Sequence, residues 1–301
     1  MDVRRLRLLR ELADRGTVTA VAEALSYTPS AVSQQIRALQ TEVGVPLTEP
    51  AGRGLRLTDA GWSLAARADE ILAALDRAEA ELDTYRSSPR GVVRVASFPS
   101  AALLLLPGLL RRMAEHPKVR LECRDIDMAP TEVPRLTADF DLVVTHRDDH
   151  APPFDDRRME ITPLLREPLD VALPPGHPLA DRERVELTEL VREPWLSVDI
   201  GFPVDDVLRS LAVRTGARPQ VIQRINDFRV IEALVADGHG IALLPRHSTE
   251  GTRLVLRPLA GVRAGRNIEV VSRRGATEHP AVQVALEALL AEAAVVVEGS
   301  G

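Results

Sequence analysis

The first sixty residues show apolar positions with helical spacing, interrupted by short polar turns. A first helix is expected to end at Gly16, and Thr17 or Thr19 is placed to cap the next one. Thr28 followed by Pro29 is typical of a further helix start. Two short helices joined by a three-residue turn predict a helix-turn-helix.

A small hairpin, or wing, is expected over residues 52–58, followed by one long helical pattern over 61–86. Along this pattern, apolar residues recur alternately four and three positions apart, which is the spacing of a coiled-coil seam. We expect the seam to pair with a second chain and form a dimer; the alternative is packing on the helix's own domain. The seam residues are Leu64, Ala68, Ile71, Leu75, Ala78 and Leu82.

Residues 87–91 have the composition of a linker. From residue 92 to 297, strand-like and helix-like segments alternate, which predicts an α/β fold with largely parallel strands. Cys123, the only cysteine, lies in an alternating stretch. We interpret it as a buried strand thiol rather than a reactive one.

Composition is that of a soluble globular protein, with 45% hydrophobic and 27% charged residues. No apolar run reaches the roughly 20 residues that span a bilayer, and the first residues lack a signal-peptide core. We therefore expect a cytoplasmic protein with no membrane contact. The net charge of -6 is unlike that of a nucleic-acid coat protein, yet residues 29–40 contain Arg37 and no acid. A local basic face is compatible with this balance.

The helix beginning at residue 29 has a polar face suited to a DNA groove, because recognition helices present short polar side chains to base edges. Gln34 is a candidate adenine reader, a contact worth roughly 1–3 kcal/mol of discrimination. On pattern alone, a three-helix bundle with a solvated polar face explains these residues equally well. The candidate DNA-binding residues are Thr28, Pro29, Ser30, Ser33, Gln34 and Arg37 in the helix and Arg53 and Arg56 in the wing.

The order and spacing of several short motifs resemble the DNA-binding domain of LysR-type transcriptional regulators. These motifs are Ala-Val-Ala-Glu-Ala-Leu at 20–25, Ser-Ala-Val-Ser-Gln-Gln-Ile at 30–36, Leu39, Gly44, Leu-Arg-Leu-Thr at 55–58 and Gly61. The rest of the chain resembles the effector domain of the same family. The supporting motifs are Leu-Pro at 106–107, His-Pro at 116–117, Phe-Asp-Leu at 140–142, Gly-His-Pro-Leu at 176–179 and the run at 236–245.

The chain departs from the family pattern around the wing. Thr48 and Pro50 stand where the family usually has a bulky apolar residue and an arginine, so one phosphate or minor-groove contact is in doubt. Gln40 stands where the family usually has glutamate, and the pair at 29–30 replaces a common Gln-Pro pair. Base reading therefore falls to Gln34.

The resemblance implies an N-terminal winged helix-turn-helix over 1–60, all α with a small wing. A dimerising linker helix and hinge would occupy 61–90, and an effector-binding domain 91–301. The effector domain is expected to have two α/β lobes, as in periplasmic binding proteins, with the chain crossing between them twice. Lobe one would comprise 92–165 and 267–297, and lobe two 166–266.

In such a domain, ligands bind beyond the carboxyl ends of strands, where helix N-termini point inward. Ser97 and Ser100 before a helix would suit a carboxylate or another anion. Thr145 is either a ligand or a strand-end hydroxyl that satisfies the backbone, and Asp227 is either a ligand or an N-cap. The candidate effector-binding residues are Ser97, Phe98, Pro99, Ser100, Thr145, His146, Ile200, Gly201, Phe202, Asp227 and Phe228.

The sequence gives little evidence of catalytic or metal-binding motifs. His146 and His150 flank two aspartates, but no further metal ligand is evident, so we expect no metal. Nucleophile-elbow, Walker and dinucleotide motifs are missing from the sequence. We therefore expect no enzyme activity and no cofactor apart from an unidentified small-molecule effector.

The expected function is that of a sequence-specific transcription regulator whose activity is modulated by the effector bound between the two lobes. The expected partners are double-stranded promoter DNA, the effector and a second copy of the chain, with a tetramer and RNA polymerase implied by the family. The alternatives are a solute-binding module whose helical N-terminus docks a protein, and an enzyme.

Overall fold

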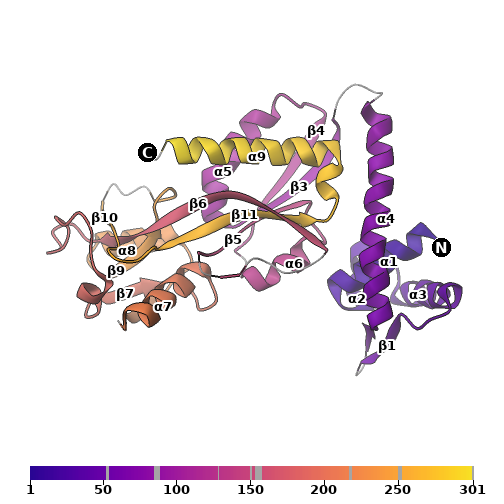
Figure 1. Cartoon of the computed structure of the whole chain (residues 1–301), viewed down its shortest axis with the longest axis horizontal. Coiled ribbons are helices and arrows are strands. Elements are labelled where there is room, and N and C mark those ends of the chain that lie inside the picture. The colour runs from indigo at the N-terminus through magenta and orange to yellow at the C-terminus, as the bar shows by residue number, and fades with distance from the viewer. Residues whose placement is uncertain are drawn as a thin grey trace.

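A computed structural model of the chain describes residues 1–51, 54–84, 89–127, 129–149, 151–152, 158–216, 219–249 and 253–299. At 76–77, 79–84 and 215 it describes the backbone alone. A helical N-terminal part and a larger α/β part lie at opposite ends of the molecule, as Figure 1 shows.

The N-terminal part is a winged helix-turn-helix followed by a long helix. Its elements are α1 (Val3–Arg15), α2 (Val18–Leu25), α3 (Pro29–Val43), β1 (Thr48–Ala51), β2 (Gly54–Leu57) and α4 (Asp59–Thr84). Gly16 ends α1 in the left-handed conformation, and Thr17 rather than Thr19 caps α2. The Thr28 hydroxyl accepts a hydrogen bond from the Ala31 amide, which confirms the predicted start of α3.

The core of this part joins α1, α2 and α3 to the first half of α4. Leu9, Val32 and Leu39 are fully buried there together with Ala65 of α4. Gly61 is required by a close approach, because a Cβ at that position would lie 2.1 Å from the Leu47 carbonyl oxygen. The wing and α4 are thus fixed against each other.

The α/β part contains one sheet in the order β4-β3-β5-β11-β6-β9-β7-β8, with β10 paired to β6. The strands are β3 (Gly91–Ser97), β4 (Val119–Asp125), β5 (Leu142–Asp148), β6 (Met159–Leu173), β7 (Pro194–Ser197), β8 (Gln220–Arg224), β9 (Ile241–Pro245), β10 (Val255–Pro258) and β11 (Gly265–Arg273). The helices are α5 (Pro99–Met113), α6 (Val133–Leu136), α7 (Pro203–Thr215), α8 (Phe228–Ala236) and α9 (Pro280–Glu298), with short 3₁₀ turns at Pro130–Glu132, Leu187–Leu190 and Ala276–Glu278.

The sheet is mixed, so the expectation of largely parallel strands needs correction. β3 is parallel to β4 and β5, and β7 is parallel to β8 and β9. β6, β10 and β11, in contrast, pair in antiparallel fashion. The reason is that β6 and β11 carry the chain between the two halves of the sheet in opposite directions (Figure 1).

Two hydrophobic cores define two lobes. One core surrounds Leu105, Ile268 and Leu289, and the other surrounds Trp195 and Leu243. β6 pairs with β11 up to Pro168 and with β9 from Leu169 onward, so the lobes meet at this point of the strand.

Helix α9 packs against α5 (Figure 1). It is apolar along most of its length. By length and composition alone it could cross a membrane, with a mean hydropathy of 1.7. Ala281, Ala285 and Leu289, however, are fully buried in the core of the first lobe, as in a core helix of a soluble domain. The α9 pattern is therefore weak evidence for a membrane.

Candidate functional site

The exposed face of α3 carries the polar residues that the sequence singled out. Ser30, Gln34 and Arg37 are exposed at helical spacing, on the side of α3 opposite the buried residues Val32 and Ile36. At the helix start, the Thr28 and Ser30 hydroxyls lie 3.0 Å apart, and Pro29 is exposed. Ser33 is half-buried. A recognition helix needs a free polar face of this kind to enter the major groove.

The wing is held by the residues that depart from the family pattern. Gln40 Oε1 accepts hydrogen bonds from the Leu47 amide at 3.0 Å and from the Thr48 amide and hydroxyl at 2.8 Å. Arg56 Nε donates to Glu49 at 2.7 Å, and both side chains are exposed. Arg53 lies outside the described residues.

The predicted seam of α4 divides between two environments. Ala68 is fully buried in the core of its own chain, and Leu64 is half-buried against that core. Ile71, Leu75 and Ala78 are exposed, with Ile71 at 36% and Leu75 at 41%. The Leu82 side chain lies outside the described part of the chain. The exposed seam residues that the structure describes therefore lie beyond the first half of α4; outside the seam, Trp62 is also exposed, at 48%.

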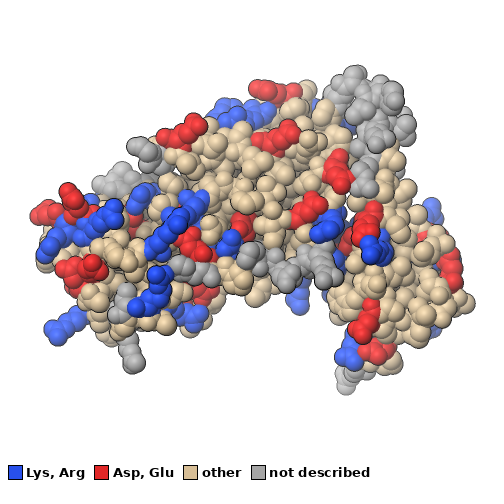
Figure 2. Space-filling model, in the orientation of Figure 1, with Lys and Arg blue, Asp and Glu red and all other residues tan. Residues whose placement is uncertain are grey.

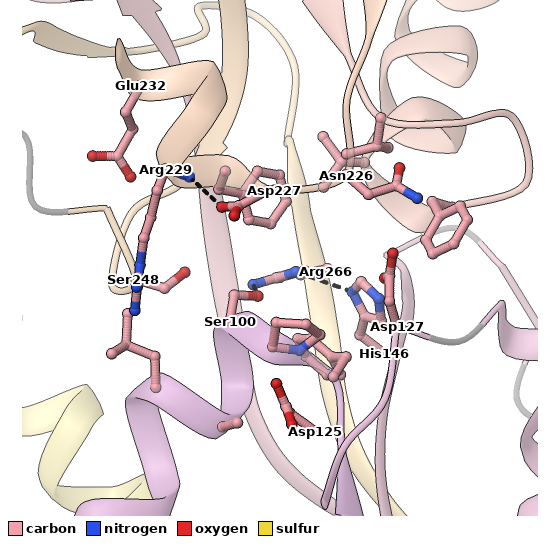
Figure 3. Close-up of a pocket in the computed structure, with 18 of the residues that line it drawn as sticks. Ser100, Asp125, Asp127, His146, Asn226, Asp227, Arg229, Glu232, Ser248 and Arg266 are labelled. Carbon is pink, nitrogen blue, oxygen red and sulfur yellow. Dashed lines mark hydrogen bonds between the residues drawn. The ribbon is translucent and has the colours of Figure 1, made fainter.

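A cavity of about 570 Å³ lies where the two lobes meet, and its lining comes from both. The N-termini of α5, α7 and α8 contribute residues, as do β4, β5 and the first residues of β11. Figure 3 shows Arg266 and His146 at its centre, with Ser100 beside them and the carboxylates of Asp125, Asp127 and Asp227 around them. Its volume suits a small organic molecule.

Arg266, which lines the cavity, forms a buried ion pair with Glu167 behind the lining. Arg266 donates to Glu167 Oε2 through Nε at 2.9 Å and Nη2 at 2.6 Å, and both residues are 0% exposed. Glu167 Oε1 accepts from the His247 amide and from the amide and hydroxyl of Ser248, each at 3.1 Å. The Glu167 charge is thus fully engaged, and it balances that of Arg266.

Arg266 also contacts Ser100 and His146, which lie beside it in the cavity lining. Its Nη2 donates to the Ser100 hydroxyl at 2.9 Å, and its Nη1 lies 3.2 Å from His146 Nδ1. Phe98 stacks on His146 with ring centroids 4.0 Å apart. Burial and then the Arg266 charge lower the pKa of His146 well below its ordinary value, so the imidazole is neutral at neutral pH.

Seven of the eleven candidate effector residues line the cavity. They are Phe98, Pro99, Ser100, His146, Phe202, Asp227 and Phe228. Asp227 also caps α8, accepting from the Arg229 amide at 2.9 Å, which confirms the N-cap role.

Ser97, Thr145, Ile200 and Gly201 are not part of the cavity lining. Thr145 and His146 lie within β5, so their side chains point to opposite faces of the sheet, and only His146 reaches the cavity. The buried Thr145 hydroxyl has no hydrogen-bond partner within the described residues, whereas Ser97 is buried and donates to the Phe98 carbonyl. Ile200 is 66% exposed on a loop.

Sequence reasoning missed several cavity residues, chiefly Arg266 and the strand-end carboxylates Asp125 and Asp127. The carboxylates had a visible signal, because they follow the alternating pattern of β4. Cys123 is half-buried in the same lining, where burial raises the pKa of its thiol. The thiol form is therefore favoured over the reactive thiolate.

A second ionic cluster joins the N-terminal part to the first lobe. Arg158, the residue before β6, donates to Asp69 of α4 at 2.8 Å and also to Asp14 of α1. Arg273 of β11 donates to Asp14 at 2.9 Å, and Arg15 pairs with Asp139 at 2.7 Å. Figure 2 shows acidic and basic side chains mixed rather than segregated over the visible face.

Among the residues that the structure describes, no group of three His, Cys, Asp or Glu side chains is arranged to hold a metal ion. His150, weighed above as a ligand, lies outside them.

A winged helix-turn-helix joined by a long helix to a two-lobed binding domain defines the class of ligand-responsive DNA-binding regulators. Residues 3–62 match the bacterial regulatory helix-turn-helix proteins of the lysR family, and residues 86–294 match the LysR substrate binding domain. The chain belongs to the LysR family of transcriptional regulators.

Relatives and solved structures agree with this assignment. The transcriptional dual regulator GltC of Bacillus subtilis is 31% identical over 252 residues, 81% of each chain. The SDS degradation transcriptional activation protein of a Pseudomonas species is 32% identical over 295 residues, covering 94% of this chain and 93% of the relative.

Among solved structures, a full-length OxyR variant from Pseudomonas aeruginosa shares 18% identity with a TM-score of 0.68, covering 96% of this chain and 98% of that one. Full-length CbnR in complex with its target DNA shares 20% identity with a TM-score of 0.56, covering 97% and 100%. These two likenesses show the same fold.

Proposed function

We propose that this regulator reads promoter DNA with α3, pairs through α4 and responds to a small molecule in the cavity between its lobes. Residues 1–60 would bind DNA, 61–90 would form the dimerising helix and hinge, and 91–301 would respond to the effector. The observation that carries the DNA-reading role is the exposed face formed by Ser30, Gln34 and Arg37, which no part of the described chain covers.

The dimer is supported by the exposed apolar face of Ile71, Leu75 and Ala78 on α4. Two-fold pairing would place two α3 helices on half-sites one helical turn apart. Two dimers would form a tetramer, as proposed from the family resemblance, and an effector that changes the arrangement of the domains would change the bend of the DNA. Such coupling usually amounts to roughly 1–3 kcal/mol.

The remaining proposals follow from the family. The protein acts in the cytoplasm, binds its effector reversibly and does not turn it over, since the curated relatives are regulators. RNA polymerase is a further proposed partner, because a promoter-bound regulator acts beside it.

Two neighbouring glutamines offer a matched test of the DNA-reading role. Gln34 is exposed on the proposed reading face, whereas Gln35 accepts a hydrogen bond from Arg5 Nε at 3.1 Å. In a mobility-shift titration on the protein's own upstream DNA, Gln34→Ala is expected to weaken specific binding about 5- to 150-fold, as for the loss of a base contact.

Binding of Gln34→Ala to random DNA should change little, and Gln35→Ala should leave the difference between specific and random DNA intact. Equal losses on both kinds of DNA for Gln34→Ala would remove it from base reading. No salt-dependent binding to the upstream DNA by the unaltered protein would reject the function itself.

A further inference from the structure

The charges around the cavity between the lobes are unbalanced. The Arg266 charge is taken up by Glu167, which has no part in the cavity lining. His146 is neutral, so the free charges that line the space are chiefly carboxylates. Asp125, Asp127 and Asp227 approach from three sides, as Figure 3 shows. A ligand that enters meets an acidic environment.

Within the described residues, Asp127 has no ion pair with an arginine or a lysine. Burial, followed by the charges of Asp199 and Glu132, raises the pKa of Asp127, against a hydrogen bond from Asn226 that lowers it. Arg229 also lines the cavity, but Figure 3 shows it on the side of Ser248, away from Asp127. A positive charge brought to Asp127 would relieve the repulsion among these carboxylates.

The anion site expected at the start of α5 is already engaged. The Ser100 hydroxyl accepts a hydrogen bond from Arg266, whose guanidinium lies 5.0 Å from the centre of the Phe98 ring and 5.7 Å from that of Phe228. An anion there would have to compete with Glu167 for Arg266 and approach the nearby carboxylates. A cation beside Asp125 and Asp127 would not have to displace an ion pair, because neither carboxylate forms one within the described residues.

We propose that the effector of this regulator is a small organic amine, whose cationic group binds Asp125 and Asp127 in the cavity between the lobes. This assignment rests on the proposed function, since it takes the cavity to be the effector site. Phe202, which also lines the cavity, offers an aromatic face to the carbon chain or the ammonium group of such a ligand.

Three four-carbon probes separate charge from shape: 1,4-diaminobutane, 1,4-butanediol and succinate. Each is added at about 50 mM to the full-length protein at neutral pH, with sodium chloride matching the ionic strength. A millimolar ligand at this excess should raise the thermal midpoint by a few degrees. The diamine is expected to produce that shift, and the diol and succinate less than half of it.

Asp125→Asn and Asp127→Asn keep the side-chain shape and remove one charge each. The double variant should lose most of the shift that the diamine produces. Glu115→Gln removes an exposed carboxylate at the end of α5, outside the cavity, and should keep that shift. A succinate shift equal to or larger than that of the diamine, an unchanged shift in the double variant, or no diamine shift in the unaltered protein would each overturn the proposal.

Mobility shifts on the same samples distinguish a failure of the amine assignment from a failure of the proposed function. DNA binding that persists while the diamine has no effect on the midpoint overturns the amine assignment alone. If the unaltered protein shows no specific DNA binding, the proposed function is overturned instead. A diamine that raises the midpoint and also changes the DNA affinity of the unaltered protein supports both.

Discussion

At the scale of single residues, Gln40 is the clearest example of a side chain with a structural role beside the DNA-binding face. Its amide oxygen accepts three hydrogen bonds from Leu47 and Thr48, where the wing begins. Thr48 replaces the bulky apolar residue usual in the family, and its hydroxyl is one of the three donors. The two departures therefore compensate for each other in one local network.

Gln40→Ala is expected to lower the free energy of unfolding by about 1–3 kcal/mol, because it leaves half-buried donors without an acceptor. Gln40→Glu should be nearly neutral, since a carboxylate accepts the same three bonds. Urea denaturation of the full chain measures both variants. Equal destabilisation by the two would show that the amide NH₂ group, rather than the oxygen, is what matters.

The residue scale also shows where sequence reading succeeds. The caps at Thr17 and Thr28 and the end of α1 at Gly16 depend on a few consecutive residues, so the sequence displays them directly. The site of Arg266 depends on its pairing with Glu167, 99 positions away in the chain. No local pattern signals such a contact, and so the central group of the cavity was missed.

At the scale of elements, the two halves of α4 have different surroundings. Its first half packs through Ala65 and Ala68 into the N-terminal core, and its second half exposes Ile71, Leu75 and Ala78. The seven-residue spacing was visible in the sequence, but the division between buried and exposed seam positions was not. The spacing of a helix reports which residues share a face, and not what covers that face.

Leu75→Glu is expected to raise the dissociation constant of the proposed dimer by at least about tenfold, because it places two like charges at the two-fold seam. Sedimentation velocity over a concentration series measures the change. Ser63→Glu adds the same charge to an exposed position of α4 away from the apolar face, and should leave the constant unchanged. An unaltered dimer in Leu75→Glu would place the interface elsewhere.

At the scale of the whole molecule, the ionic cluster of Arg158, Asp14 and Asp69 holds the DNA-binding part against the first lobe. Burial, followed by the charge of Asp14, raises the pKa of Asp69 against the opposing effect of Arg158. One Asp69 oxygen is buried without a hydrogen-bond partner within the described residues. The cluster therefore depends more on Arg158 than on the charge of Asp69.

Arg158→Ala is expected to cost about 3–5 kcal/mol of stability, because it leaves the buried Asp69 carboxylate without its arginine partner and Asp14 with Arg273 alone. Asp69→Asn should cost less than about 1 kcal/mol or stabilise the protein. Since the folded pKa of Asp69 is raised, its contribution to stability is present at low pH and lost as the pH rises through that pKa. Asp69→Asn should lack this component.

Thermal unfolding of the unaltered protein, Arg158→Ala and Asp69→Asn between about pH 4 and pH 7 measures both the stability changes and their pH dependence. A larger loss in Asp69→Asn than in Arg158→Ala would contradict this assignment of roles.

The strands β6 and β11 connect the two ionic centres. Arg158 immediately precedes β6 and Arg273 ends β11, and both belong to the cluster beside α1 and α4. Each strand also carries one member of the buried pair, Glu167 or Arg266. Seven to nine residues of extended chain separate the centres, roughly 23–30 Å. A molecule that separated Arg266 from Glu167 would therefore displace β6 and β11 relative to each other. Because the far ends of these strands contact α1 and α4, the displacement would reach the DNA-binding part.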